Sequence, residues 1–239
     1  MKNLVDLHAH ILPGLDDGPE DLKGSLKMLE ALEEMGFGHV FATPHHRLYS
    51  WAGIMPETVE NGVKEVSMAA AKNGVGLKLL PGMEFDLDEA LPERASTVPG
   101  GAGHILVDVG FLGVPRGLAG LLGKVKDVRA TVFLVHPERN RELCRLRKEL
   151  SDLITSGVRL LGNIGSLSGM YGREVRRDAR DLLKEGHYWG MASDMHSHEQ
   201  SPWIRDGIDE LVLLAGNSAA EKLMVTQPME IVQAMEDDS

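Results

Sequence analysis

Short apolar runs alternate with amphipathic stretches along the whole 239-residue chain, and this alternation restricts its possible folds more than any other feature. Most of the runs are apolar or β-branched, as in parallel strands that are buried on both faces. We therefore expect seven strands, at Asn3–His8, His39–Thr43, Gly76–Pro81, His104–Val109, Thr131–His136, Arg159–Ile164 and Tyr188–Ser193.

The stretches between these runs have helical periodicity. The first begins at Pro19-Glu20-Asp21 and stops at Gly36, with acidic residues early and glycine late. The other expected helices are Pro56–Lys72, Gly117–Lys126, Arg141–Thr155, Arg173–Lys184, Pro202–Leu214 and Met229–Ala234. Strands that alternate with helices predict βα units and a parallel sheet.

No linker or repeat divides the chain, so we expect one domain over residues 1–239. Segments rich in glycine and proline, such as Val98–Gly103, have the length of loops. An open doubly wound sheet would hold its ligand at a switch point, using few strand ends. Here ligand-type side chains follow nearly all strands. This pattern favours a distorted, TIM-like (β/α)7 barrel with its site at the carboxyl ends of the strands.

Composition excludes several classes of protein. A net charge of −11 argues against a nucleic-acid partner. Cys144 is the only cysteine, which excludes a disulfide framework and a cysteine-rich zinc site. There is no run of 18 apolar residues, so we expect no membrane span. The N-terminus has no apolar signal region, and we expect a cytoplasmic protein.

Histidine and carboxylate side chains gather where the expected strands end. His8 and His10 are two residues apart on a strand, so both imidazoles can face one ion. The further candidate ligands are Asp17, His45, Glu84, Asp108, His136, Asp194 and His196. Each alone is more often a turn residue, a cap or a surface charge. Their joint position after successive strands indicates a catalytic metal cluster, and the donor types suit manganese, iron or zinc.

A cluster of several divalent ions can bind a phosphoryl oxygen and lower the pKa of a bound water. Arg139 lies three residues after His136 and could offer a planar fork to phosphate oxygens. Three aromatic residues in expected loops could form a platform for a phosphorylated ring or simply pack at the rim: Tyr49, Trp51 and Trp203.

The remaining histidines and the cysteine have other expected roles. His46 and His198 could orient ligands. We expect His39, His104 and His187 to be structural or exposed. The segment after Cys144 has no glycine and no arginine six positions on, so the mechanism of cysteine-dependent phosphatases is rejected and Cys144 is expected to be an ordinary helix residue.

The ordered set of His-x-His, Asp-Gly, His, Glu, Asp, His and Asp-x-His resembles the polymerase and histidinol phosphatase (PHP) superfamily. Within it, the segments 6–10 and 15–19 resemble the metal-dependent protein-tyrosine phosphatases of bacterial capsule and exopolysaccharide loci. The segments 43–46, 136–139 and 193–196 match the same subfamily, and the resemblance covers about residues 4–198.

This resemblance implies a site with three ions, most often manganese. By analogy, the first ion is held by His8, His10, Glu84 and Asp194. Glu84 bridges to a second ion, which Asp108 and His136 also hold. The third ion is held by Asp17, His45 and His196.

Two positions depart from the pattern of the subfamily. Asp108 stands where glutamate is usual, and its shorter side chain could weaken one ion site or change the metal preference. Ser201 stands where a second phosphate-binding arginine is expected. Arg205 from the next helix, or Arg47 from the opposite loop, could take its place beside Arg139.

The resemblance implies hydrolysis of phosphotyrosine on a protein, such as the tail of a tyrosine kinase for exopolysaccharide assembly. Two alternatives stay open. One is a phosphatase for small molecules of the histidinol-phosphate type. The other is a regulatory protein that binds metal without catalysis.

Overall fold

Nine parallel strands form two sheets in the computed structural model, which describes residues 1–47, 50–51, 53–95, 98–99, 103–128 and 131–237. The three-stranded sheet has the order β1 (Leu4–Ala9), β2 (Phe37–Ala42), β4 (Lys78–Pro81). The six-stranded sheet has the order β3 (His45–His46), β5 (Glu84–Asp86), β6 (His104–Asp108), β7 (Thr131–Val135), β8 (Arg159–Asn163), β9 (Tyr188–Ala192).

The two sheets continue each other, because β2 leads into β3 and β4 leads into β5. The Gly82 N–H donates to the Ala42 carbonyl (2.9 Å), and the Glu84 N–H donates to the Pro44 carbonyl (3.1 Å). Pro44 has no N–H of its own to donate, which interrupts the strand at this point. The seven strands expected from the sequence are all present, and the short strands β3 and β5 are two further strands that were not expected.

The expected ring is not closed by a ladder between β9 and β1 in the described residues. An isolated bridge joins Ala9 to Met195, and the Asp194 N–H donates to the His8 carbonyl (2.8 Å). One residue earlier, the Ser193 N–H donates to the Asp6 carboxylate (2.9 Å), which takes the place of a backbone carbonyl of β1. The parallel α/β architecture is confirmed, but its closure is limited to the end that carries the candidate ligands.

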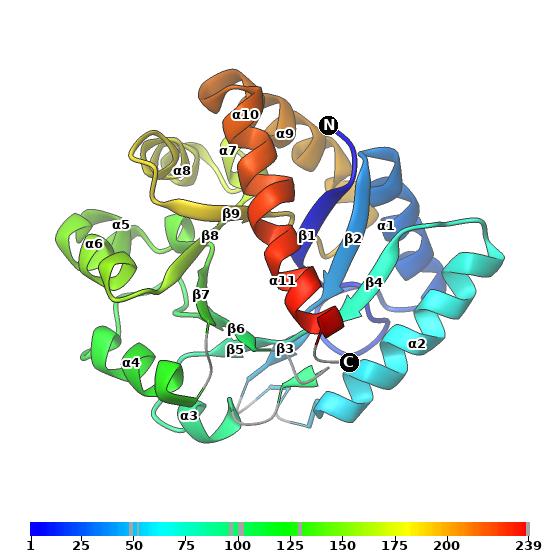
Figure 1. Cartoon of the computed structure of the whole chain (residues 1–239), viewed down its shortest axis with the longest axis horizontal. Coiled ribbons are helices and arrows are strands. Elements are labelled where there is room, and N and C mark those ends of the chain that lie inside the picture. The colour runs from blue at the N-terminus through cyan, green and yellow to red at the C-terminus, as the bar shows by residue number, and fades with distance from the viewer. Residues whose placement is uncertain (48–49, 52, 96–97, 100–102, 129–130, 238–239) are drawn as a thin grey trace.

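Helices surround the strands (Figure 1). The longer ones are α1 (Leu22–Glu34), α2 (Pro56–Lys72), α4 (Leu118–Val128), α6 (Arg147–Thr155), α8 (Arg173–Lys184), α9 (Ser201–Ala215) and α11 (Gln227–Asp237). Helix α1 begins after Asp21 and not at Pro19, because the Asp21 side chain accepts a hydrogen bond from the Gly24 N–H (2.8 Å) and so caps the helix. In Figure 1, α11 crosses β1 and β9, and its buried face covers the seam between them.

Several short elements were not expected from the sequence. They are α3 (Leu91–Arg94), η2 (Pro137–Arg139), α7 (Ile164–Ser168), η3 (His198–Gln200), α10 (Asn217–Glu221) and η4 (Lys222–Thr226). The helix α5 (Arg141–Arg145) is the first part of an expected helix. The single helix expected over Arg141–Thr155 is wrong, because Leu146 (φ −89°, ψ 59°) leaves the helical region and separates α5 from α6. No described helix is both long and apolar enough to cross a membrane.

Close packing of α9 against α7 depends on Gly207. A Cβ atom at this position would lie 2.2 Å from the Ile164 carbonyl oxygen. Gly207→Ala should therefore lower the free energy of unfolding by about 1–3 kcal/mol, since the helices must move apart. The matched control is Gly123→Ala in α4, where a Cβ meets nothing within 4 Å. The control should raise stability by about 0.5–1 kcal/mol. Urea unfolding measures both, and equal stabilities for the two variants would contradict the close approach.

Candidate metal centre

All nine candidate ligands lie together where the strands end. They form four overlapping groups, in each of which one ligand atom per residue lies within 4.8 Å of the others. The groups are His8, His10, Glu84; Glu84, Asp108, His136; His10, Asp17, His45, His196; and His8, His136, Asp194. Eight of the nine come from buried or half-buried positions, and Asp17 is the exposed one.

The Glu84 carboxylate is at the centre of these groups. Its Oε1 lies 3.0 Å from Nε2 of His136 and 3.6 Å from Nε2 of His8. Its Oε2 lies 2.5 Å from Nδ1 of His45 and 3.6 Å from Nε2 of His10. Glu84 begins β5, and its side chain is shielded from solvent. One buried carboxylate thus faces four imidazoles from three other strands.

Asp194 uses its two oxygens differently. Its Oδ1 faces Nε2 of His8 (3.3 Å) and of His10 (3.4 Å). Its Oδ2 accepts hydrogen bonds from Nη1 of Arg139 (2.8 Å) and Nδ2 of Asn163 (2.9 Å). One oxygen is therefore directed at the histidine cluster, while the other is held by two donors.

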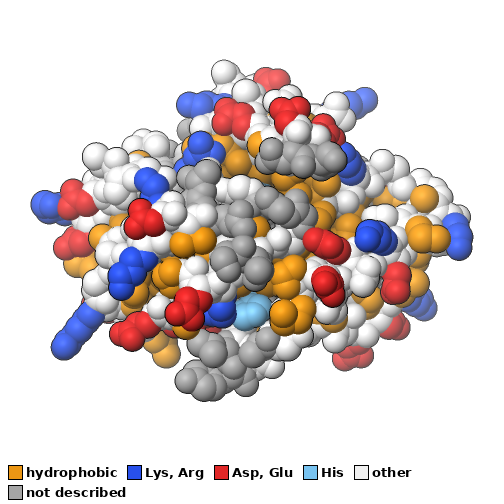
Figure 2. All heavy atoms as spheres, turned by 60° about the horizontal axis from the view of Figure 1, so that its bottom comes forward, with side chains coloured by type: hydrophobic (Ala, Val, Ile, Leu, Met, Phe, Trp, Pro, Cys, Tyr) orange, Lys and Arg blue, Asp and Glu red, His pale blue; other side chains and the backbone are white. Residues whose placement is uncertain are grey.

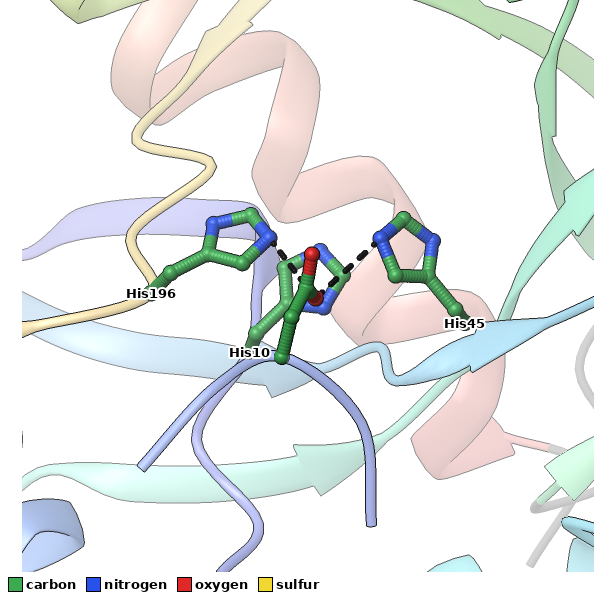
Figure 3. Close-up of side chains that lie close together, drawn as sticks. His10, His45 and His196 are labelled. Atoms are coloured by element: carbon green, nitrogen blue, oxygen red, sulfur yellow. Dashed lines mark ion pairs between the residues drawn. The ribbon is translucent and has the colours of Figure 1, made fainter. Parts of the chain in front are cut away.

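The third gathering point is the Asp17 carboxylate. Its Oδ1 lies 3.4 Å from Nε2 of His45 and 3.3 Å from Nε2 of His196. Figure 3 shows the rings of His45 and His196 directed toward each other, with His10 between them. On the face shown in Figure 2, a histidine reaches the surface beside a basic side chain.

Two polar side chains that the sequence reasoning did not assign fix the rings of His8 and His10. Nδ1 of His8 lies 2.7 Å from the Thr43 hydroxyl, which can accept the Nδ1 proton while it donates to the Ala9 carbonyl (3.3 Å). Nδ1 of His10 donates to Oδ2 of Asp16 (2.7 Å). Protons held on Nδ1 leave Nε2 of both rings as the metal-binding atom. The second aspartate of the Asp16-Asp17 pair was assigned from the sequence, and the first was missed.

The backbone is strained at two of the candidate ligands. His136 (φ 34°) and Asp194 (φ 51°) are in the left-handed region, which costs about 1–3 kcal/mol for a residue other than glycine. His136 follows directly after β7, and Asp194 lies two residues after the end of β9. The turn redirects each side chain from the strand end into the cluster.

Unpaired buried atoms show that this donor set fits cations. Nε2 of His8 and Nε2 of His10 are buried, and neither makes a hydrogen bond of good geometry among the described residues. Buried polar atoms are ordinarily hydrogen-bonded. Here both nitrogens face the carboxylates of Glu84 (3.6 Å each) and Asp194 (3.3 and 3.4 Å), which is the arrangement that a shared cation would satisfy.

Electrostatics in the protein alone point the same way. Burial would raise the pKa of Glu84, but the charges of His8 and His45 hold it well below its usual range. Burial likewise opposes protonation of His10, yet its hydrogen bond to Asp16 and the nearby carboxylates of Asp194 and Glu84 raise its pKa to about 10. Burial lowers the pKa of His8, so the protons that balance the carboxylates are on other rings, such as those of His10 and His45, and binding of a metal ion must displace them.

A cavity of about 250 Å³ opens onto the cluster, and two arginines line it. Arg139 belongs to η2 and reaches Asp194, as described above. Arg47 follows β3, bonds Asp86 (Nε to Oδ1, 3.0 Å) and lies 3.6 Å from Asp108. Arg205 is exposed on α9 and does not line this cavity. The structure thus brings Arg139 and Arg47 to the site but not Arg205.

A scan of family models matches residues 4–233 to the family described as capsular polysaccharide synthesis, CpsB/CapC. The chain belongs to this family. Tyrosine-protein phosphatase YwqE of Bacillus subtilis is 28% identical over 198 residues, which cover 81% of this chain and 78% of YwqE.

Two solved structures share the fold of this chain. A crystal structure described as YwqE from Bacillus subtilis and CpsB from Streptococcus pneumoniae, metal-dependent tyrosine phosphatases, matches with a TM-score of 0.83 and 24% identity, covering 98% of this chain and 93% of that one. Histidinol phosphate phosphatase from Lactococcus lactis, with zinc, histidinol and phosphate, matches with a TM-score of 0.59 and 13% identity, covering 90% and 95%. The resemblance to the capsule-associated family is confirmed by the family model.

The aromatic side chains at this family member's cavity differ from the expected set. Trp51 stacks on His45 (ring centroids 5.0 Å apart, 14° between planes), whereas Trp203 is outside the cavity lining and Tyr49 is outside the described residues. Phe111 and Tyr171 line the cavity, and the sequence reasoning missed both. Phe111 lies three residues after the candidate ligand Asp108, which is the one signal in the sequence, whereas Tyr171 follows no candidate ligand and only the fold could place it.

The other histidines stay outside the ligand groups. Nδ1 of His46 lies 3.0 Å from Nη1 of Arg94, next to the β3–β5 pair. His104 is buried against the rings of Phe41 and Phe133, and burial lowers its pKa to about 4. His198 begins η3, His39 is half-buried in β2, and His187 precedes β9.

Cys144 is a buried residue of α5 whose thiol contacts the Pro137 carbonyl (3.3 Å). Burial raises its pKa to about 12, so the thiolate form is disfavoured. This agrees with the rejection of a cysteine-based mechanism.

Asp16 should control metal affinity through His10. In Asp16→Asn the amide no longer attracts the Nδ1 proton, and we expect manganese affinity to fall about 10- to 100-fold. Calorimetric titration of the metal-free protein measures this affinity. Asp21→Asn is the matched control, because asparagine also caps a helix and Asp21 is exposed. Equal affinities of the two variants would contradict the orienting role of Asp16.

Proposed function

We propose that this protein is a metal-dependent phosphatase that hydrolyses phosphotyrosine in proteins. The observation that carries this proposal is the gathering of nine imidazole and carboxylate side chains around one small cavity that Arg139 also lines. The curated relatives are named tyrosine-protein phosphatases, which gives the substrate class. We further propose that residues 1–239 act as a single domain, because the ligands come from strands along most of the chain.

The proposed centre holds three divalent ions. Glu84, which faces four imidazoles, would help to hold one ion with His8, His10 and Asp194 and another with Asp108 and His136. Asp17, His45 and His196 hold the third. Manganese is favoured, with iron or zinc as alternatives, since the donors are nitrogen and oxygen atoms without thiolate.

The ions would supply Lewis-acid stabilisation of the phosphoryl oxygens and a nucleophile at neutral pH. The chain itself supplies binding and orientation. The planar guanidinium of Arg139 offers charge-assisted hydrogen bonds to phosphate oxygens at the cavity. Arg47 reaches the same cavity from the opposite loop, where it stands in for the arginine that Ser201 replaces. Phe111 and Tyr171 give this cavity an apolar wall suited to the aryl group of the substrate.

The physiological substrate that we propose is a tyrosine kinase of exopolysaccharide or capsule assembly, acting in the cytoplasm. The description of the family, capsular polysaccharide synthesis, supports this assignment. A small-molecule phosphatase of the histidinol-phosphate type is the second candidate, because histidinol phosphate phosphatase shares the fold. A regulatory protein without turnover is the third, and it leaves the arginines in the cavity without a role.

Turnover tests these candidates directly. The manganese-loaded protein should hydrolyse a phosphotyrosine peptide with a higher kcat/KM than histidinol phosphate. A strong chelator should abolish activity, and added manganese should restore it. Cys144→Ser and thiol alkylation should leave activity unchanged, because the thiol is buried and protonated. Preference for histidinol phosphate would favour the second candidate, and absence of any turnover would favour the third.

Removal of Glu84 should disturb the centre most, because a bridging carboxylate serves two ions. We expect Glu84→Ala to lose the two ions that share it and all phosphatase activity. Metal analysis after gel filtration gives the number of ions per chain. Glu89→Ala, an exposed carboxylate five residues later, is the control and should keep full metal content. Undiminished metal in Glu84→Ala would refute the bridging assignment.

The arginines can be separated by kinetics on a phosphotyrosine peptide. Arg139→Ala and Arg47→Ala should each slow turnover about tenfold to a hundredfold, which corresponds to loss of a charge-assisted hydrogen bond. Metal content should not change. Arg205→Ala is the comparison, and its exposed position predicts wild-type kinetics. If Arg205→Ala is slow and Arg47→Ala is not, the second cation comes from α9 instead.

A further inference from the structure

We propose that Phe111 and Tyr171 are positioning residues that hold the guanidinium of Arg139, and that Asn163 joins this aromatic clamp to Asp194. The arginine and the carboxylate would then be oriented as one unit. This inference deepens the proposed function, since it concerns the phosphate-binding role of Arg139. It assigns a purpose to three residues that are not candidate ligands.

The clamp is made by two rings around one guanidinium. The Cζ atom of Arg139 lies 4.2 Å from the ring centroid of Phe111 and 4.2 Å from that of Tyr171. The rings come from different parts of the chain, Phe111 from the segment after β6 and Tyr171 from the segment after α7. Aromatic faces attract a cation and displace water from its planar surface. The faces of the guanidinium are thereby covered, and its N–H edge is the part that can bind a phosphate.

Hydrogen bonds of Asn163 connect the clamp to Asp194 of the candidate metal centre. Nδ2 of Asn163 donates both to the Tyr171 hydroxyl (3.1 Å) and to Oδ2 of Asp194 (2.9 Å). The same Oδ2 accepts Nη1 of Arg139 (2.8 Å). Arg139, Asp194, Asn163 and Tyr171 thus form a ring of contacts in which each touches two others.

Asn163 is itself held on both sides, which makes it a rigid link. Its side-chain oxygen accepts the Gly165 N–H (2.9 Å), and this bond caps α7 and fixes the direction of the amide. Its backbone N–H donates to Oε1 of Glu138 (2.8 Å), a buried carboxylate next to Arg139 in the sequence. Oε2 of Glu138 accepts the hydroxyl of the buried Tyr188 (2.9 Å).

In this arrangement, different atoms of Asp194 and Arg139 have different roles. With Oδ2 of Asp194 occupied by two donors, only Oδ1 is directed at His8 and His10. One amino group of Arg139 is committed to Asp194, so its remaining N–H groups are available for a phosphate. Without the clamp, Arg139 should keep its charge, but its guanidinium should be able to rotate. Phosphate binding should weaken while the metal ions stay bound.

A double-mutant cycle on the manganese-loaded protein tests this coupling. The probe is inorganic phosphate, and its affinity is measured by calorimetry for wild type, Tyr171→Leu, Arg139→Ala and the double variant. We expect Tyr171→Leu to weaken binding roughly 3- to 30-fold, as for loss of a partly buried cation–π contact. The double variant should bind phosphate no more weakly than Arg139→Ala alone, because Tyr171 acts through the arginine. If the double variant instead loses phosphate affinity by the product of the two single losses, the proposal is overturned.

Two further variants protect the test against loss of folding. Tyr171→Phe keeps the ring and removes only the bond from Asn163, so it should weaken phosphate binding less than Tyr171→Leu does. Phe111→Leu removes the more exposed ring, which is 44% accessible, and should weaken binding in an Arg139-dependent way. Leu112→Ala changes a fully exposed neighbour (98% accessible) and should bind phosphate as wild type does. Wild-type affinity in both Tyr171→Phe and Phe111→Leu would contradict the clamp.

Failure of the clamp and failure of the proposed function give different results. If wild type binds phosphate in an Arg139-dependent way but does not hydrolyse a phosphotyrosine peptide, the proposed function is wrong and the clamp is upheld. If wild type hydrolyses the peptide and the cycle shows no coupling between Tyr171 and Arg139, the clamp is wrong and the function is upheld. Metal content that falls in Tyr171→Leu would also overturn the clamp, because the role would then be structural.

Discussion

The buried carboxylate of Glu84 is the constraint on which the rest of the site depends. A buried anion is costly unless it is paired, and Glu84 is surrounded by imidazoles of His8, His10, His45 and His136. These residues come from strands that are distant in sequence but parallel in space. The interruptions at Pro44 and Gly82 begin the short strands that bring His45 and Glu84 to the same level. The fold therefore delivers its charged groups to one point, where a cation can balance them.

Around this point, the protein gives three of the ligands a second partner. Thr43 and Asp16 hold the rings of His8 and His10, and Arg139 and Asn163 hold one oxygen of Asp194. Such partners fix the atom that each ligand presents to the metal. The cost is visible in the backbone, in the left-handed turns of the ligands after β7 and β9 and in the seam between β9 and β1 that only an isolated bridge joins.

Much of this arrangement could be predicted from the sequence. The seven strands followed from apolar runs, and the candidate ligands followed from their positions after those runs, because parallel strands end at one face. The partners Thr43, Asp16 and Asn163 could not be assigned, since each acts through a side-chain hydrogen bond to a ligand of another segment, and the sequence does not show which side chains meet. Phe111 and Tyr171 were missed for the same reason. The break at Leu146 and the incomplete ring depend on local geometry, which periodicity does not record.

The most direct test of the central claim is a crystal structure of the manganese-loaded protein with anomalous scattering at the manganese absorption edge. The account predicts three anomalous peaks among the nine ligands, two of them bonded to opposite oxygens of Glu84. It also predicts that Oδ1 and not Oδ2 of Asp194 contacts an ion. Peaks that lie away from Glu84, or a single ion that leaves the Glu84 carboxylate unbound, would contradict the account.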